Sequence, residues 1–140
     1  MNKEKIVFAA IRISLGFVFL WAFIDKTFGL GFATIAEKAW INGGSPTFGF
    51  LTFGTKGPFM DFYQSLAGNP IIDWLFMIGL AFVGITLIIN KFVKLGSLAG
   101  IAMLFLMYTA ALLPENNPVI DDHVIYILVL ALIAFKKENE

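Results

Sequence analysis

The sequence of 140 residues contains no cysteine and only one histidine, His123. The lack of cysteine excludes disulfides, thiol redox chemistry, haem attachment through a CxxCH motif and cysteine-ligated iron–sulfur clusters. One histidine cannot supply both ligands of a bis-histidine haem within one chain. The sequence has no flavin signature either. Electrons handled by this chain must therefore reside on a diffusible molecule, on a partner's cofactor or on a cofactor shared between chains.

Charged residues are also scarce, at 14% of the chain, whereas soluble domains contain about 25%. The ten basic and ten acidic residues give a net charge of zero, and the aromatic residues lie in apolar runs rather than among lysines. The chain therefore lacks the basic stripe expected of a nucleic-acid-binding protein. With 59% hydrophobic residues and a mean hydropathy of +0.83, its composition is typical of a membrane protein.

Four apolar runs are long enough to cross a bilayer, which requires roughly 20 helical residues. They cover about residues 6–24, 71–89, 95–113 and 119–135. The first run is interrupted by Arg12 and is not followed by a small-residue cleavage site, which favours a retained helix over a signal peptide. The sequence thus predicts an all-α membrane protein: one domain over residues 1–140, folded as a four-transmembrane-helix bundle.

The lysines indicate how this bundle is oriented. In a chain with four spans, one side of the membrane receives Lys3, Lys5, Lys91, Lys94, Lys136 and Lys137, and the other receives Lys26, Lys38 and Lys56. Basic residues accumulate on the cytoplasmic side, so we expect both termini to be cytoplasmic. The long outer loop between the first two helices, about residues 27–70, is rich in phenylalanine and predicts a lid or binding element. Short helices are expected in it near residues 33–40 and 58–66.

Two features inside the spans have alternative interpretations. Gly96 and Gly100 have the GxxxG spacing, which favours helix packing within the chain or in a homo-oligomer. Arg12 lies about six residues into the first span, where an arginine is unfavourable by roughly 2.5–3.5 kcal/mol near a helix centre. Either it reaches the cytoplasmic headgroups as an anchor, or it faces the bundle and binds a polar ligand, with Asn90 at the same depth.

Polar residues gather at the expected outer ends of three spans. Asp121, Asp122 and His123 begin the last span, Asp25 and Lys26 end the first, and Asp73 and Trp74 begin the second. Trp21 and Tyr126 lie one helical turn deeper on the same faces. We expect these groups to converge on one plane beneath the outer loop.

The Asp-Asp-His-x-x-Tyr pattern predicts the chemistry of this plane. Helix capping explains one aspartate per helix start, but it requires neither a second aspartate nor a histidine. A histidine beside carboxylates and a tyrosine suits proton transfer to or from a quinone. We therefore expect His123, Asp121, Asp122 and Tyr126 to be catalytic. A metal site formed by His123, Asp122 and Asp73 lacks a ligand-spacing motif, so no metal is predicted.

The sequence also resembles the DoxX/DoxD family of small four-helix membrane proteins, and especially the large subunit of thiosulfate:quinone oxidoreductase. The resemblance covers nearly the whole chain through RISLG, WAFIDK, WINGGSPTFGFL, GPFMDFYQSLAGNPIIDWLF and PENNPVIDDHVIY. It implies oxidation of thiosulfate to tetrathionate with quinone as electron acceptor, a smaller second subunit as partner, and a location in the inner or plasma membrane of a prokaryote.

The implied substrates suggest binding residues. Thiosulfate is a dianion and requires positive charge or backbone N–H donors. These are offered by Lys26, Lys38, Lys56 and the NGGS turn (Asn42, Gly43, Gly44 and Ser45). Quinone would lie against Trp21, Trp74 or Tyr126. We also expect Asp73, on the same plane, and Arg12, at the other end of the bundle, to bind substrate.

Two other classes of function remain open. The chain could be a non-catalytic anchor that recruits a soluble redox enzyme through residues 27–70 and has no quinone dependence. It could also be a small transporter or a lipid- or quinone-binding protein, although four helices without inverted repeats do not favour transport.

Overall fold

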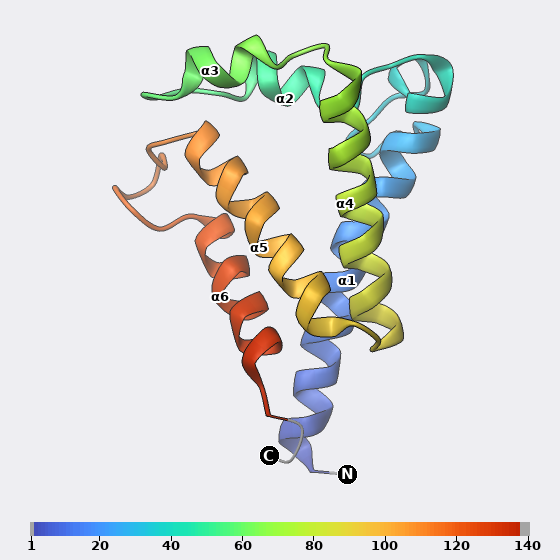
Figure 1. Ribbon diagram of the computed structural model, residues 1–140, viewed down its shortest axis with the longest axis vertical. Helices are drawn as coiled ribbons and strands as arrows, with labels where there is room; N and C mark the ends of the chain where they lie inside the picture. The colour runs from blue at the N-terminus through green and yellow to red at the C-terminus, as the bar shows by residue number, and fades with distance from the viewer. Residues whose placement is uncertain (1, 138–140) are drawn as a thin grey trace.

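The computed structural model describes residues 2–137, and these residues are helical, with no strand beyond an isolated bridge between Lys56 and Ala111. Four longer helices form the body of the molecule (Figure 1): α1 Lys3–Phe28, α4 Pro70–Ile89, α5 Val93–Ala110 and α6 Asp122–Phe135. Two 3-10 helices, η1 Ala36–Lys38 and η2 Trp40–Asn42, and two short α-helices, α2 Phe48–Phe53 and α3 Met60–Ser65, lie between α1 and α4. The predicted all-α architecture is confirmed.

Three helices, α1, α4 and α5, are long and apolar enough to cross a membrane. Helix α6 is apolar but has 14 residues, so its length is about 21 Å at 1.5 Å per residue. A hydrocarbon core is roughly 30 Å thick. The last predicted span therefore overestimated the helix, which begins at Asp122 rather than at residue 119. The third predicted span, 95–113, was displaced toward the C-terminus, because α5 begins at Val93 and ends at Ala110.

Side-chain caps define the starts of three of these helices. The Asn2 side chain accepts a hydrogen bond from the Glu4 amide at 3.0 Å at the start of α1, and the Asn69 side chain accepts one from the Ile71 amide at 2.9 Å at the start of α4. Asp121 begins α6 in the same way, accepting from the Val124 amide at 3.2 Å. Such caps satisfy N–H groups that have no partner within the helix. The expected aspartate cap of α6 is confirmed as Asp121.

The long helices pack in chain order, α1 on α4, α4 on α5 and α5 on α6. Figure 1 shows α4 and α5 diverging toward the end that carries the α1–α4 connection. We call this end the loop end, and we call the opposite end, where α1 begins and α6 finishes, the terminal end. The buried core between the helices consists of Leu15, Phe19, Met77, Leu80, Val83, Leu87, Leu104, Leu130 and Ile133.

Glycines bring the helices into close contact. A Cβ atom at Gly84 of α4 would lie 2.7 Å from the backbone nitrogen of Leu20 in α1. The predicted GxxxG pair on α5 is occupied in the same way: a Cβ at Gly96 would meet Thr86, and one at Gly100 would lie 2.8 Å from Leu130. Both glycines are buried within one chain, so they are not available to a second copy. The prediction of a homo-oligomer through Gly96 and Gly100 is therefore wrong for this face.

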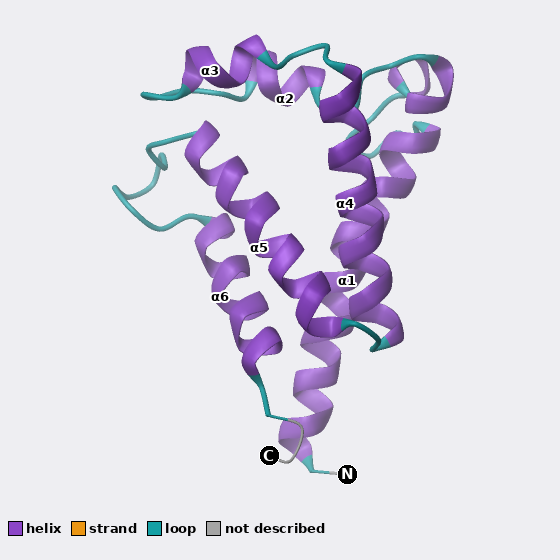
Figure 2. Cartoon of the chain, in the orientation of Figure 1, coloured by secondary structure: helices purple, strands orange, loops and turns teal. Residues whose placement is uncertain are grey.

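Residues 29–69, between α1 and α4, form what we call the connecting segment: its first half contains η1 and η2, and its second half contains α2 and α3. The connecting segment folds over the loop end, as Figure 2 shows. Tyr63 of α3 and Thr109 of α5 share a hydrogen bond of 2.6 Å between their hydroxyl oxygens, and the Lys56 amide donates to the Ala110 carbonyl at 3.0 Å. These bonds fasten the second half of the segment to the end of α5. The predicted short helices correspond to η1 with η2 and to α3, whereas α2 was not predicted.

Candidate functional site

The only histidine of the chain forms a close pair with an aspartate at the start of α6. The Nδ1–H of His123 donates to Oδ2 of Asp121 at 2.8 Å, and each side chain is 25% exposed. The other oxygen of Asp121 accepts from the Val124 amide. Burial disfavours the charged carboxylate, but the hydrogen bonds from His123 and Val124 outweigh it and lower the pKa of Asp121 below its ordinary value. Asp121 therefore orients the imidazole while remaining an anion.

This pair lines a cavity of about 680 Å³ at the loop end, which we call the histidine cavity. Phe53, Ile120 and Ile125 give it apolar walls, and the adjacent backbone turns of residues 54–56 and 114–117 contribute to its rim. Lys56 and Glu115 also line it and form an ion pair of 3.6 Å between Nζ and Oε1. The cavity thus combines an apolar surface, a histidine–aspartate pair, one lysine and two further carboxylates, those of Glu115 and Asp122.

The other two predicted catalytic residues differ in position. Asp122 lines the histidine cavity and is exposed. Tyr126 lies on α6 and is 38% exposed, but it does not belong to the lining of this cavity. The structure therefore places Asp121, Asp122 and His123 together and leaves Tyr126 beside them, outside the cavity.

Asp25 has a structural role that the sequence did not suggest. Its side chain is only 1% exposed, and its two carboxylate oxygens accept hydrogen bonds from four backbone amides. These amides belong to Leu30, Phe32, Ala33 and Thr34, at 2.7–3.3 Å. The carboxylate therefore holds the chain where it leaves α1. One signal was present in the sequence: an acidic residue near a helix C-terminus is unfavourable for the helix dipole and calls for another stabilising role.

Asp73 is likewise engaged with the connecting segment. Its Oδ1 accepts hydrogen bonds from Ser45 Oγ at 2.7 Å and from Thr47 Oγ1 at 2.6 Å, and the residue is buried. The neighbouring Trp74 packs edge-to-face on Trp40, with ring centroids 4.7 Å apart. Asp73 and Trp74 therefore anchor the first half of the segment to the start of α4.

The predicted anion-binding turn makes bonds of its own. The amides of Gly43 and Gly44 donate to the carbonyls of Trp40 and Ala39, and the Asn42 side chain donates to the Ala36 carbonyl at 2.8 Å. Ser45 is bonded to Asp73. These donors shape the turn, and anion binding by residues 42–45 stays a prediction.

The plane of polar groups expected at the loop end is divided in two. Asp25 and Asp73 bind the first half of the connecting segment beside α1 and α4, together with half-buried Lys26 and with Trp21, which packs edge-to-face on Phe32 at 5.0 Å. The histidine cavity lies instead between the second half of the segment and α6. None of the predicted residues of α1 and α4 lines it.

Arg12 is buried and faces the bundle. It is 8% exposed, and its Nη1 donates to the carbonyl of Leu87 and, at 3.5 Å, to that of Ile88. These carbonyls belong to the last turn of α4, where positive charge is favourable for the helix dipole. Arg12 and Asn90 also line a second cavity, at the terminal end. Of the two alternatives, the structure therefore supports the one in which Arg12 faces the bundle, and binding of a polar ligand by Arg12 stays a prediction.

Within residues 2–137, no group of three or more histidine, aspartate or glutamate side chains is arranged to hold an ion. A small organic ligand requires no such group, because it binds through apolar contacts and a few hydrogen bonds. The histidine cavity offers both kinds of contact.

The outward sides of the long helices are apolar. Phe17 of α1, Ile78 of α4 and Phe105 of α5 are 56%, 58% and 57% exposed. Such surfaces match lipid tails rather than water. Together with the length of α1, α4 and α5, they define the class: a helical integral membrane protein. No protein-family model, curated protein or solved structure matches the chain.

Proposed function

We propose that the chain is the membrane subunit of an oxidoreductase that passes electrons to a quinone in the histidine cavity. The observation that supports this proposal is the pair of His123 and Asp121, 2.8 Å apart, on the wall of a cavity that also has apolar side chains. Reduction of a quinone requires proton delivery at an apolar ring site, and a histidine oriented by a carboxylate is suited to it.

Thiosulfate is the proposed electron donor, on the basis of the sequence resemblance. Two thiosulfate ions lose one electron each and join through a new sulfur–sulfur bond to give tetrathionate. The quinone takes up these two electrons and two protons to become a quinol. Nδ1 of His123 is bonded to Asp121, so Nε2 of the imidazolium would donate a proton to one quinone oxygen, take up another proton from water and deliver it to the second oxygen. Lys56, on the same cavity wall, would attract the dianion.

We further propose that the chain crosses the membrane four times, with both ends cytoplasmic, in the inner or plasma membrane of a prokaryote. Helix α6 alone is short for a crossing. Val119 and Ile120, which precede its cap Asp121, are apolar and exposed and would lie at the membrane interface at the outer end of the crossing. Lys94, Lys136 and Lys137 gather at the terminal end, which supports a cytoplasmic position for that end.

The test is thiosulfate-dependent reduction of a soluble quinone analogue by the purified chain in proteoliposomes, with and without a co-purified second subunit. We expect His123→Ala to lower kcat by about 10²–10⁴-fold, the usual contribution of a positioned acid–base group. Lys91→Gln, an exposed change at the terminal end, serves as the control. Unchanged turnover in His123→Ala would remove the proton-transfer role.

A non-catalytic membrane anchor is the second candidate. The observation that favours it is a set of exposed phenylalanine side chains on the connecting segment, where Phe32, Phe53 and Phe62 are 74%, 82% and 61% exposed. A soluble redox partner could bind such a surface. An anchor predicts loss of partner binding in Phe53→Ser and no quinone turnover by the chain under any condition. Quinone turnover that depends on His123 would exclude this role.

A further inference from the structure

The cavity at the terminal end is distinguished by its charge. It has a volume of about 950 Å³ and is lined by residues of α1, α5, α6 and the α4–α5 turn. We call it the basic cavity, because five basic side chains line it: Lys5, Arg12, Lys94, Lys136 and Lys137. Among the described residues that form its wall, none is acidic. A concentration of positive charge of this kind favours an anionic ligand.

The start of α5 adds backbone donors to this cavity. Val93, Lys94 and Leu95 line it, and the preceding residue, Phe92, provides no side-chain cap for the helix. The first intrahelical backbone bond runs from the Gly96 amide to the Phe92 carbonyl at 2.9 Å. The amides before Gly96 therefore carry the partial positive charge of a helix N-terminus. The N-terminus of α5 and the five basic side chains therefore contribute positive charge to the same cavity.

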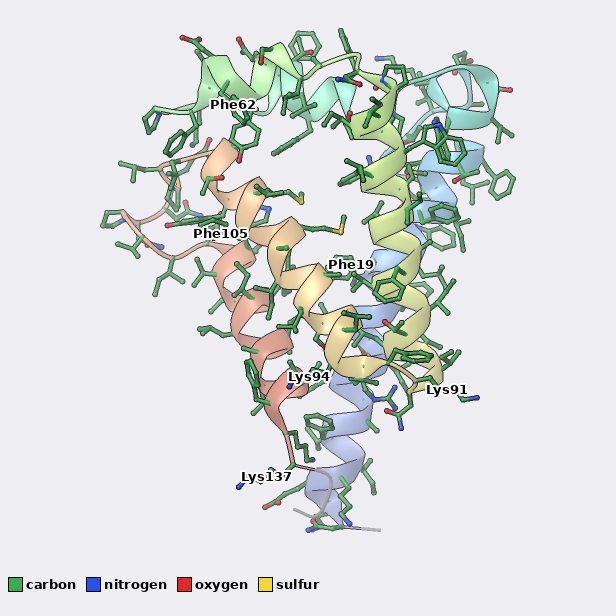
Figure 3. The ribbon with its side chains drawn as sticks, in the orientation of Figure 1. Phe19, Phe62, Lys91, Lys94, Phe105 and Lys137 are labelled. Atoms are coloured by element: carbon green, nitrogen blue, oxygen red, sulfur yellow. The ribbon has the colours of Figure 1, made fainter. Side chains whose placement is uncertain are left out.

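The walls of the basic cavity are partly apolar. Phe8, Leu98 and Ile133 line it beside the cations. Lys136 lies with Nζ 3.7 Å from the centroid of the Phe8 ring. Figure 3 shows Lys94 and Lys137 near the lower parts of α5 and α6, whereas Lys91 extends away on the α4 side. A ligand that fits this wall has a compact anionic group joined to an apolar part.

We propose that the basic cavity binds a phosphate group, with the headgroup of an anionic phospholipid as its principal source. Phosphate fits lysine and arginine donors together with a helix N-terminus, and basic pockets between membrane helices bind anionic headgroups. The apolar wall would hold the start of the acyl chains. The proposal is independent of the histidine cavity, which lies at the opposite end of the molecule.

The experiment is native mass spectrometry of the full chain released from detergent, with phosphatidylglycerol or phosphatidylcholine added in matched amounts. The variant Lys94→Gln/Lys136→Gln removes two cavity cations and keeps Arg12, which bonds to α4. Its control, Lys3→Gln/Lys91→Gln, removes two positive charges from exposed positions outside the cavity lining. Thermal unfolding of each variant establishes that it is folded. A parallel series adds inorganic phosphate as competitor.

We expect the wild-type chain to retain phosphatidylglycerol in preference to phosphatidylcholine, with at least a tenfold loss of retention in Lys94→Gln/Lys136→Gln and less than twofold in the control. Displacement of the lipid by millimolar inorganic phosphate would identify free phosphate as a second source, and resistance would assign the site to lipid alone. Equal retention of the two lipids, or equal losses in the two variants, would overturn the proposal.

Discussion

At the scale of single residues, the carboxylates near the loop end divide by what they bind. Asp25 and Asp73 accept hydrogen bonds from the connecting segment and are almost fully buried. Asp121 accepts from His123 and lies beside a cavity. In sequence all three are acidic residues at a helix end near an apolar run. Only the hydrogen-bond partners show that Asp25 and Asp73 stabilise the fold and that Asp121 belongs to the candidate site.

The clearest prediction at this scale concerns Asp25. Asp25→Asn removes the charge and one of the two oxygens that receive four amides. Because amides left unpaired in a buried site are unfavourable, we expect a loss of about 2–4 kcal/mol in the free energy of unfolding. Thermal unfolding in detergent measures it. Asp61→Asn, at an exposed position on α3, is the matched control. Equal melting of Asp25→Asn and wild type would contradict the role.

The lowered pKa of Asp121 predicts that the stability of the fold depends on pH. Its pKa is lower in the folded chain than its ordinary value, because hydrogen bonds to the carboxylate outweigh the effect of burial. The ionised group therefore stabilises the fold above the unfolded pKa of about 3.9, and this contribution is lost as the pH falls through the folded value. We expect the difference in melting temperature between wild type and Asp121→Asn to narrow from pH 6 toward pH 3.

The control for this titration is Asp122→Asn, which makes the same change of charge at the adjacent, exposed position. Melting curves of the three proteins at each pH measure the effect. A difference between wild type and Asp121→Asn that stays constant down to pH 3 would contradict the account. So would an equal narrowing in Asp122→Asn.

At the scale of elements, the sequence predicted what hydrophobicity and capping determine. The apolar runs located α1, α4, α5 and α6, although the last predicted span began at residue 119, two residues before the capping residue Asp121. Helix α2, FGFLTF, was missed because its aromatic residues and glycine also suit a loop. Its buried Leu51 packs in a cluster with Tyr63 and Ala110, residues far away in the sequence. Tertiary contacts of this kind decide short helices, and no local pattern reports them.

The glycine contact between α1 and α4 gives a prediction for these elements. A Cβ at Gly84 would lie 2.7 Å from both the nitrogen and the Cβ of Leu20, so Gly84→Ala must separate the helices. We expect a loss of about 1–3 kcal/mol in the free energy of unfolding. Gly49→Ala in α2 is the control, because a Cβ there meets nothing within 4 Å. Equal stability of the two variants in a thermal unfolding assay would show that α1 and α4 do not pack this closely.

At the scale of the whole molecule, α5 separates the two groups of polar residues. The helices pack in the order α1, α4, α5, α6, so the residues of α6 face the second half of the connecting segment rather than Asp25 or Asp73. A sequence gives the depth of a residue in the membrane from its distance to the helix end. It does not give the position of each helix around the bundle. The prediction that polar residues of equal depth lie together was therefore correct for Asp121, Asp122 and His123, which share one helix start. It was wrong for the residues of α1 and α4, which do not line the histidine cavity.

The molecule also has two ends of different chemical character. The loop end carries the histidine cavity with its carboxylates, and the terminal end carries the basic cavity with five cations. Arg12 faces the second of these. A polar ligand could therefore in principle use either end, and the proposed function requires quinone at the loop end.

Covalent labelling with a photoreactive quinone analogue tests this requirement most directly. The full chain in proteoliposomes is irradiated with the analogue, digested and mapped by mass spectrometry. We predict labels within residues 53–56 and 120–125, which line the histidine cavity, and suppression of these labels by excess unlabelled quinone. Labels confined to the surroundings of Arg12 and Lys94, or labels that excess quinone does not reduce, would contradict the account.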